Sequence, residues 1–302
     1  MMIFAPMFSI FILLASGYLA KKTKVLAQNQ SIFFIDFVLC FALPALIFDK
    51  IYHVTIDTHL INIILTGLTS SIIAMFIAVG AGIVFKFKKP TIVSLALLSM
   101  FGNTLFVGMP IVEGFFGDSA LNEVIFYDQL ATGIPISILG PLILSLGAPA
   151  KVSIIQNTMK ILKFPPFVAL LLGLICKNFE LPDVIFAPLR MFASSVVPVA
   201  LFAVGIGLGF NSIKSAWKSS LVVLGAKMVL APAIFVLITM IFDIKLNQSW
   251  MVGLLETAMP PMVLASAMIL KANLDTNLAI SSVALGIIFT FITIPTIFII
   301  MN

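Results

Sequence analysis

The amino-acid sequence predicts an all-α polytopic membrane protein with ten transmembrane helices, arranged as two inverted five-helix repeats in which helices 4 and 9 are broken. Three observations lead to this prediction. The chain of 302 residues is 61% hydrophobic and only 10% charged, whereas a soluble domain carries about 25% charged residues. Its lysines fall in alternate loops, and its prolines recur at a nearly constant offset.

Lipid must be the main solvent of this chain, because a soluble core could not hide so much apolar surface. A span needs about 20 apolar residues, and the length accommodates ten such spans with short loops and no separate soluble domain. The expected spans are residues 3–20, 31–49, 59–85, 91–116, 120–146, 161–178, 184–210, 217–242, 248–270 and 277–300.

Charge in the loops predicts the orientation. Twelve of the seventeen Lys and Arg residues follow spans 1, 3, 5, 7 and 9, and most of the acidic loop residues lie in the opposite loops. Cytoplasmic loops are enriched in Lys and Arg, so we expect both termini outside a bacterial plasma membrane. The net charge of +5 then reflects topology within a lipid bilayer and no nucleic-acid binding. A homodimer is one oligomeric state that the sequence allows.

Proline motifs indicate an internal repeat. We expect residues 1–146 to form the first repeat, residues 147–160 a cytoplasmic linker and residues 161–302 the second repeat. Each repeat has five spans, an odd number, so the second enters the membrane from the opposite side, as in many transporters. The matching prolines are Pro6 with Pro166, Pro44 with Pro198 and Pro135 with Pro295, at offsets of 160, 154 and 160 residues.

Two spans are interrupted at matching positions. Span 4 contains FGNTLFVGMPIVEGFFG from Phe101 to Gly117, and span 9 contains two adjacent prolines at an offset of 157 residues from Asn103 and Thr104. Each break begins about 12 residues into its span, which is roughly 18 Å of helix and therefore close to the bilayer centre. Unpaired backbone groups at this depth are tolerated only inside protein or in a water-filled cavity.

Such breaks can form a binding site. Proline lacks an N–H group and frees a carbonyl one turn upstream, and Gly102 and Gly108 allow close backbone approach. Two half-helix N-termini at one place carry partial positive charge, which suits a carboxylate. Asn103 and Thr104 add neutral donors and acceptors. A simple kink is the alternative for one broken helix, whereas two breaks at matched positions favour a site.

Ionisable residues inside spans are costly and therefore informative. Glu256 stands one helical turn before Pro260 and is the best candidate for a cation or proton site. Freed carbonyls would complete an oxygen cage for sodium, or a protonated glutamate would carry a coupling proton. The alternative for Glu256 is a structural ion pair with Lys227. Asp128 either joins this cation site or pairs with Lys227 or Arg190.

Three motifs resemble those of the auxin efflux carrier family of bacterial permeases, over essentially the whole chain. They are the run from Gly102 to Pro110, the pair Tyr127-Asp128 and the run from Ala258 to Pro261. The resemblance implies transport of small organic anions, including malonate, malate and auxin-like acids, by alternating access. It also implies a fold related to bile acid symporters and sodium/proton antiporters, in which the broken helices 4 and 9 cross at the midplane. The sequence lacks the long central cytoplasmic loop of the plant members.

The predicted function is therefore a secondary transporter of mono- or dicarboxylates, driven by a proton gradient, a sodium gradient or the membrane potential. No cofactor is expected other than H⁺ or Na⁺ as a coupling ion, and no metal site is predicted. The predicted substrate-binding residues are Gly102, Asn103, Thr104, Gly108, Pro110, Met259, Pro260 and Pro261. The predicted residues for ion or proton coupling are Asp128, Glu256 and Lys227.

Two other functions were weighed. A sodium/proton antiporter on the same scaffold would use Glu256 and Asp128 as ion ligands without an organic substrate. Antiporters of that fold usually carry an acidic pair within span 5, where Asp128 is the one acid at depth, which disfavours this alternative. An intramembrane enzyme would need a Ser/His pair, an Asp pair or a zinc motif in facing spans. His53 and His59 lie in or at the edge of the outer loop between spans 2 and 3, so an enzyme is not expected.

Overall fold

The structure is a computed structural model that describes residues 4–53, 58–147, 163–210 and 212–301. Regular structure in these ranges is helical, apart from one isolated β-bridge. The first half contains α1 (Phe4–Lys22), η1 (Gln28–Gln30), α2 (Ser31–Phe37), η2 (Val38–Ala42), α3 (Leu43–His53), α4 (Thr58–Val84), α5 (Lys89–Met100), η3 (Thr104–Gly108), α6 (Met109–Phe116), η4 (Asp118–Ala120), α7 (Leu121–Tyr127), η5 (Asp128–Gly133) and α8 (Ile134–Ser145).

The second half begins beyond residue 162, so most of the predicted linker (147–160) and the first residues of predicted span 6 lie outside the described residues. Its elements are α10 (Pro165–Cys176), η6 (Asp183–Ile185), α11 (Phe186–Ala193), α12 (Val196–Gly207), α13 (Ile213–Leu224), η7 (Gly225–Leu230), α14 (Ala231–Ile241), α15 (Gln248–Thr257), α16 (Val263–Lys271) and α17 (Thr276–Met301).

Six helical stretches in the described chain are long and apolar enough to cross a membrane. Shorter apolar helices cover Lys89–Met100, Thr104–Phe116 and Pro165–Cys176. The predicted class, an all-helical protein with several membrane spans, is confirmed at this level. The six long stretches are Gln28–His53, His59–Val84, Asp118–Ser145, Asp183–Gly207, Ile213–Ile241 and Thr276–Met301.

Four widened helical turns, η2, η3, η5 and η7, are π-helical. Each ends two residues before a proline. A proline inside a helix donates no hydrogen bond and its ring clashes with the carbonyl four residues earlier, and a π-turn moves that carbonyl away. Such turns are frequent at functional sites. The four prolines are Pro44, Pro110, Pro135 and Pro232.

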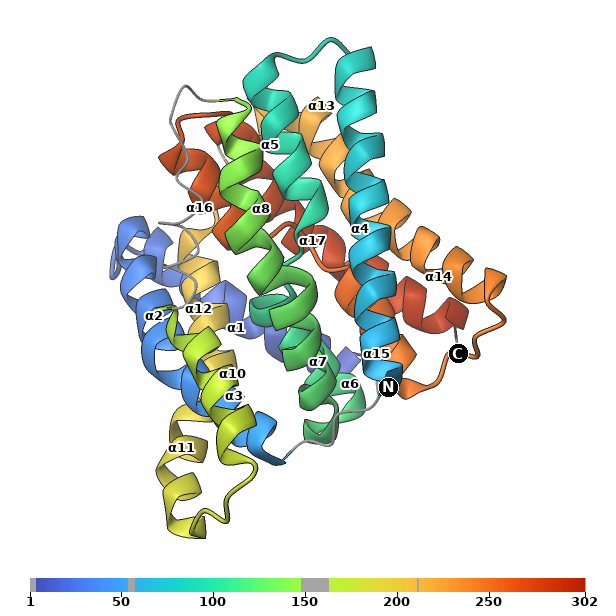
Figure 1. The fold of residues 1–302 in the computed structure, drawn as a ribbon. Helices are drawn as coiled ribbons and strands as arrows, with labels where there is room; N and C mark the ends of the chain where they lie inside the picture. The colour runs from blue at the N-terminus through green and yellow to red at the C-terminus, as the bar shows by residue number, and fades with distance from the viewer. Residues whose placement is uncertain (1–3, 54–57, 148–162, 211, 302) are drawn as a thin grey trace.

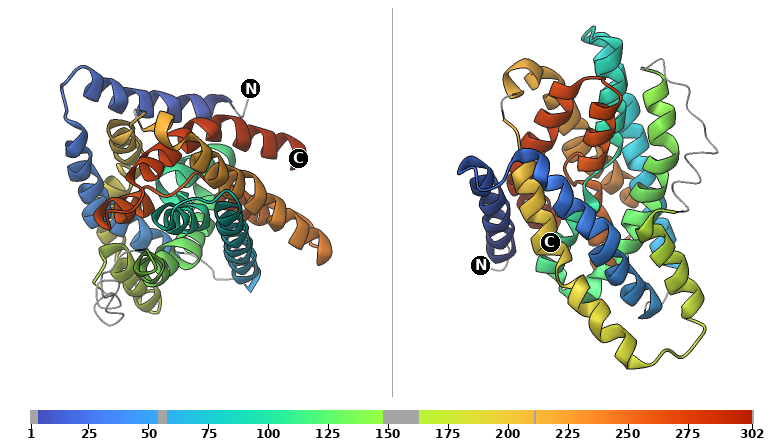
Figure 2. Two further views of the ribbon diagram at one scale, coloured as in Figure 1. Left: turned by 90° about the horizontal axis from the view of Figure 1, so that it is seen from above. Right: turned by 90° about the vertical axis from the view of Figure 1, so that its left-hand side faces the viewer.

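The helices pack into two groups (Figures 1 and 2). The first helix group comprises α1–α3 and α10–α12, in which α1 packs on α12 and α3 packs on α10 and α11. The second helix group comprises α4–α8 and α13–α17, in which α4 packs on α5, α14 and α15, and α17 packs on α13 and α16. In Figure 1 the blue and yellow elements of the first group lie to the left of the cyan helix α4. Contacts of α1 with α6, α12 with η3 and α3 with α7 join the groups.

Candidate functional site

Two helices of the second group are interrupted and meet at their interruptions. Residues 101–103 separate α5 from η3, and residues 258–262 separate α15 from α16. Between these two segments, Gly102 and Pro261 form an isolated antiparallel β-bridge. The segments therefore lie side by side although about 160 residues separate them along the chain. We call this place the crossing.

Backbone hydrogen bonds hold the crossing together. The N–H of Asn103 donates to the carbonyl of Pro260 at 2.7 Å, and the N–H of Met262 donates to the carbonyl of Phe101 at 3.0 Å. In neither case does the accepting residue donate a hydrogen bond back to the donating residue. Pro260 has no N–H to return, and the N–H of Phe101 still donates to Leu97 in the last turn of α5, at 3.3 Å. Because Pro260 cannot donate to it, the carbonyl of Asn103 is free to accept hydrogen bonds from N–H groups of the helix that follows.

Asn103 begins that helix. Its Oδ1 accepts the N–H of Phe106 at 3.2 Å, an N-cap bond that satisfies one of the free donors of a first turn. Its side chain is buried, and Nδ2 has no hydrogen-bond partner in the described structure. The N–H groups of Thr104 and Leu105 lie in the same turn, where no carbonyl of the helix can pair them. Donors therefore converge at the start of η3.

A second helix also starts at the crossing. Met262 is the N-cap of α16 in extended conformation, and its carbonyl accepts from Ser266 at 3.1 Å. The residues just before it, Met259, Pro260 and Pro261, are buried. The N-termini of the η3–α6 segment and of α16 are thus both at this place, and each carries partial positive charge. The sequence predicted both breaks as substrate contacts, and the structure places those residues together.

Asp128 faces the start of η3. The hydroxyl of Thr104 donates to its Oδ1 at 2.5 Å, and Nε2 of Gln129 donates to its Oδ2 at 3.0 Å. Asp128 lies in η5, the π-turn that precedes Pro135. The ion pairs considered from the sequence are not formed within the described residues: Asp128 bonds neither Lys227 nor Arg190, whose Nε lies 3.5 Å from Asp49 instead.

Lys227 places an ammonium group beside the crossing. Its Nζ donates to the carbonyl of Thr257 at 2.8 Å and to Oγ of Ser71 at 3.3 Å. Thr257 is the last residue of α15, so the cation lies at the negative end of that half-helix, where the helix dipole favours it. A Cβ atom at Gly102 would be only 2.8 Å from Cε of Lys227. Glycine at position 102 therefore makes room for this side chain.

Glu256 is fully buried, with 0% of its surface exposed. Both carboxyl oxygens lack a hydrogen-bond partner among the described residues, so the structural ion pair with Lys227 that the sequence allowed is not formed there. Asp128 and Lys227 are near enough to act on this carboxyl electrostatically. A buried carboxylate without partners is very costly. A proton or a bound cation would remove that cost, which makes Glu256 the group at the crossing best suited to take up either.

Two residues of this network were missed in the sequence. Thr257 follows Glu256 directly, and its hydroxyl lies 2.7 Å from the Tyr127 hydroxyl while donating to the carbonyl of Gly253 at 2.7 Å. Ser71, the second contact of Lys227, lies in the middle of an apolar helix. Two features of the sequence could have pointed to them. Thr257 is a polar residue next to an acid in the middle of a predicted span, and Ser71 is a serine deep in the predicted span 3.

Two cavities lie where the helix groups meet. The first cavity, of about 510 Å³, includes Met109, the first residue of α6 after Gly108. The second cavity, of about 460 Å³, includes Val263, the first residue of α16. Each therefore approaches the crossing along one half-helix. The first is lined by Leu46, Asp49, Lys50, Met109, Glu113, Asp118, Leu121, Arg190, Ala193, Ser194 and Val197, and the second by parts of η1, α2, α12, α16 and α17.

A multi-pass helical fold with paired helix N-termini and buried charges at one internal site defines a membrane protein of the transport class. The chain belongs to the membrane transport protein family, whose sequence model matches residues 2–298. This match confirms the resemblance to the auxin efflux carrier family. An uncharacterized transporter of Methanothermobacter thermautotrophicus is 26% identical over 294 residues, covering 95% of this chain and 94% of that protein. Another, from Methanocaldococcus jannaschii, is 25% identical over 296 residues, covering 94% of each chain.

Proposed function

We propose that this protein is a secondary transporter of small organic anions, mono- or dicarboxylates such as malonate, malate or auxin-like acids. A substrate carboxylate binds at the crossing, where Nδ2 of Asn103 and the first N–H groups of η3 and α16 donate to it. Membership of a transporter family supports transport as such. The choice of an anion rests on one observation: a buried amide donor without a partner lies beside two helix N-termini.

The helices are proposed to form ten spans in two inverted repeats, with α5–η3–α6 as span 4 and α15–α16 as span 9. The packing pairs support this proposal. Span 1 packs on span 7 through α1 and α12, and span 6 packs on span 2 through α10 and α3. Span 9 packs on span 3 through α15 and α4, and span 4 packs on span 8 through α5 and α13. A two-fold relation between the repeats would convert the pair of spans 1 and 7 into the pair of spans 6 and 2, and the pair of spans 9 and 3 into the pair of spans 4 and 8.

Alternating access would use the two cavities. In the proposed orientation the first cavity opens outside and the second opens to the cytoplasm, with both termini outside a bacterial plasma membrane. Movement of the second helix group against the first would open one cavity and close the other. The lining of both cavities by residues from both groups supports this movement.

Ligand binding to detergent-purified protein tests the substrate class. A panel of dicarboxylates and aromatic acids is compared with amines and sugars by thermal unfolding, at two pH values and with or without sodium. A ligand at 100 times its Kd stabilises the folded state by about 2.7 kcal/mol. The proposal requires stabilisation by carboxylates and their uptake by proteoliposomes. Stabilisation by none of the acids, with no uptake under any gradient, would contradict it.

A sodium/proton antiporter is the second candidate. The unpartnered carboxyl oxygens of Glu256 favour it, because a site for a bare cation needs free oxygen ligands. Against it, Lys227 already places a positive charge at the end of α15. Sodium pulses applied to proteoliposomes that contain a pH-sensitive dye separate the two functions. Proton movement that requires sodium and no carboxylate would favour the antiporter.

A further inference from the structure

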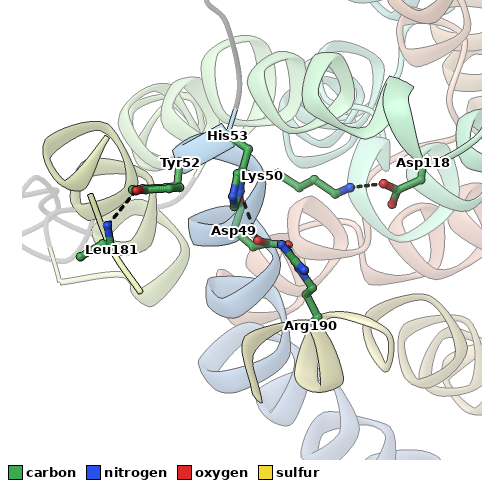
Figure 3. Close-up of polar contacts among 7 residues, drawn as sticks. All are labelled: Asp49, Lys50, Tyr52, His53, Asp118, Leu181 and Arg190. Carbon is green, nitrogen blue, oxygen red and sulfur yellow. Dashed lines mark hydrogen bonds and ion pairs between the residues drawn. The ribbon is translucent and has the colours of Figure 1, made fainter. Parts of the chain in front are cut away.

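The boundary between the helix groups carries an ion pair that the proposed binding site does not use. Lys50, in the last turn of α3, pairs with Oδ2 of Asp118, the first residue of η4 (Figure 3). Lys50 belongs to the first helix group and Asp118 to the second. Both residues line the first cavity. In the described ranges, this is the one ion pair that links the two groups.

The neighbouring charges stay within the first group. Asp49 lies 3.5 Å from Nε of Arg190 on α11, and Nδ1 of His53 lies 2.7 Å from the backbone carbonyl oxygen of Asp49 (Figure 3). The hydroxyl of Tyr52 likewise accepts the N–H of Leu181 at 3.1 Å. These contacts fix the end of α3 to the first helix group. Lys50 therefore extends from a fixed helix end towards the second helix group.

The ion pair between Lys50 and Asp118 is weak enough to break when the helix groups move apart. The Asp118 side chain is 73% exposed and that of Lys50 is 16% exposed. An ion pair with an exposed partner contributes little to stability, because water screens the attraction. A buried pair would instead be expensive to separate. Lys50 and Asp118 can therefore hold the groups together in one state and part without a large barrier.

We propose that Lys50 and Asp118 form a latch that holds the two helix groups together, so that the first cavity stays closed towards Met109 and the crossing. When the second group moves, η4 carries Asp118 away from Lys50 and the cavity opens towards Met109 and the crossing. The latch rests on the alternating-access part of the proposed function, but not on the identity of the substrate.

Thiol labelling in detergent solution tests the latch without any transport. The native thiols are removed as Cys40→Ala and Cys176→Ala, and a reporter is introduced as Met109→Cys. Met109 is fully buried, so a water-soluble maleimide reaches it only when the cavity opens. Ser194→Cys, at an exposed position of the same cavity, provides a reference for intrinsic reactivity.

Lys50→Gln should raise the labelling rate at position 109 about two- to fivefold, the range that a weak ion pair can shift a population. Lys50→Asp should raise it further through repulsion, and the exchange Lys50→Asp with Asp118→Lys should restore the original rate. Lys177→Gln removes an exposed charge of the first helix group that lines neither cavity, and it should leave the rate unchanged.

The latch is overturned if Lys50→Gln leaves the labelling rate at 109 unchanged, if the charge exchange fails to restore it, or if Lys177→Gln has an equal effect. Unchanged labelling at Ser194→Cys and an unchanged unfolding temperature show that each variant is folded. Failure to bind any carboxylate would contradict the proposed substrate while leaving these labelling rates as they are, so the two proposals fail separately.

Discussion

The carboxyl group of Glu256 lies directly against the α-carbon of Gly108, so that a Cβ atom at position 108 would be 2.3 Å from Oε2 and 2.7 Å from Oε1. A Cβ atom essentially never approaches another heavy atom to within 3.0 Å, so the carboxyl would have to move. The glycine at the end of η3 and the acid near the end of α15 therefore fit together as a pair.

Gly108→Ala should displace the Glu256 carboxyl and reduce carboxylate uptake at least tenfold, with little loss of folded protein. Gly80→Ala is the matched control, because a Cβ there would meet no atom within 4 Å. Uptake by proteoliposomes and the unfolding temperature are measured for both. Normal uptake by Gly108→Ala would show that the position of this carboxyl is not critical.

Asn103→Asp should keep the N-cap of the helix but bind the substrate carboxylate much more weakly. The aspartate keeps an oxygen for the N–H of Phe106, which preserves the N-cap, but it replaces the free Nδ2 donor by a negative charge that repels a carboxylate. Binding affinity for the substrate acid should fall at least tenfold in a titration by thermal shift. Asn247 caps α15 with the same kind of side-chain bond, to the N–H three residues on, so Asn247→Asp should bind normally. Equal losses in both variants would point to stability rather than substrate contact.

Glu256→Gln should separate binding from coupling. Glutamine resembles the protonated acid in shape but cannot release a proton, so accumulation driven by a pH gradient should disappear while exchange of labelled for unlabelled substrate continues. Both assays use the same proteoliposomes. If accumulation persists in Glu256→Gln, the coupling role of this residue is wrong, and if sodium alone stabilises the wild-type protein but not the variant, the antiporter gains support.

Lys227→Met should lower both stability and transport. Methionine fills the same space but leaves the carbonyl of Thr257 and the hydroxyl of Ser71 without their donor, and an unsatisfied buried polar group costs about 1–3 kcal/mol. Lys271→Met, at an exposed position after span 9, should change neither property. Thermal unfolding and uptake measure the two effects. An unchanged unfolding temperature for Lys227→Met would contradict the described contacts.

The sequence was most informative about local chemistry. Prolines and glycines change the backbone wherever they occur, so the interruptions near Asn103 and Pro260 could be recognised from residue type and position alone. Apolar composition likewise predicted the helical membrane class. The inverted repeat and its ten spans remain predictions, drawn from proline offsets and supported by the packing pairs.

Side-chain partners could not be predicted in the same way. Of the roles expected for Asp128, the ion pair with Lys227 or Arg190 is not formed within the described residues, and a place in a cation site stays a prediction. Its carboxylate accepts bonds from Thr104 and Gln129. Which groups meet depends on the angles at which helices from distant parts of the chain pack, and no single segment determines those angles. The Lys50–Asp118 pair has the same origin, because it joins residues on different helix groups.

The π-turns before the prolines change the direction in which side chains point about the helix axis. A π-turn holds one residue more than the α-helical turn it replaces, and one residue of α-helix corresponds to about 100° about the axis. Asp128, Lys227 and Thr104 all lie in such turns. The prolines that follow therefore set the azimuth at which these side chains leave their helices. Deleting one residue of η5 together with Pro135→Ala would turn Asp128 away from Thr104 while leaving every apolar span long enough to cross the bilayer.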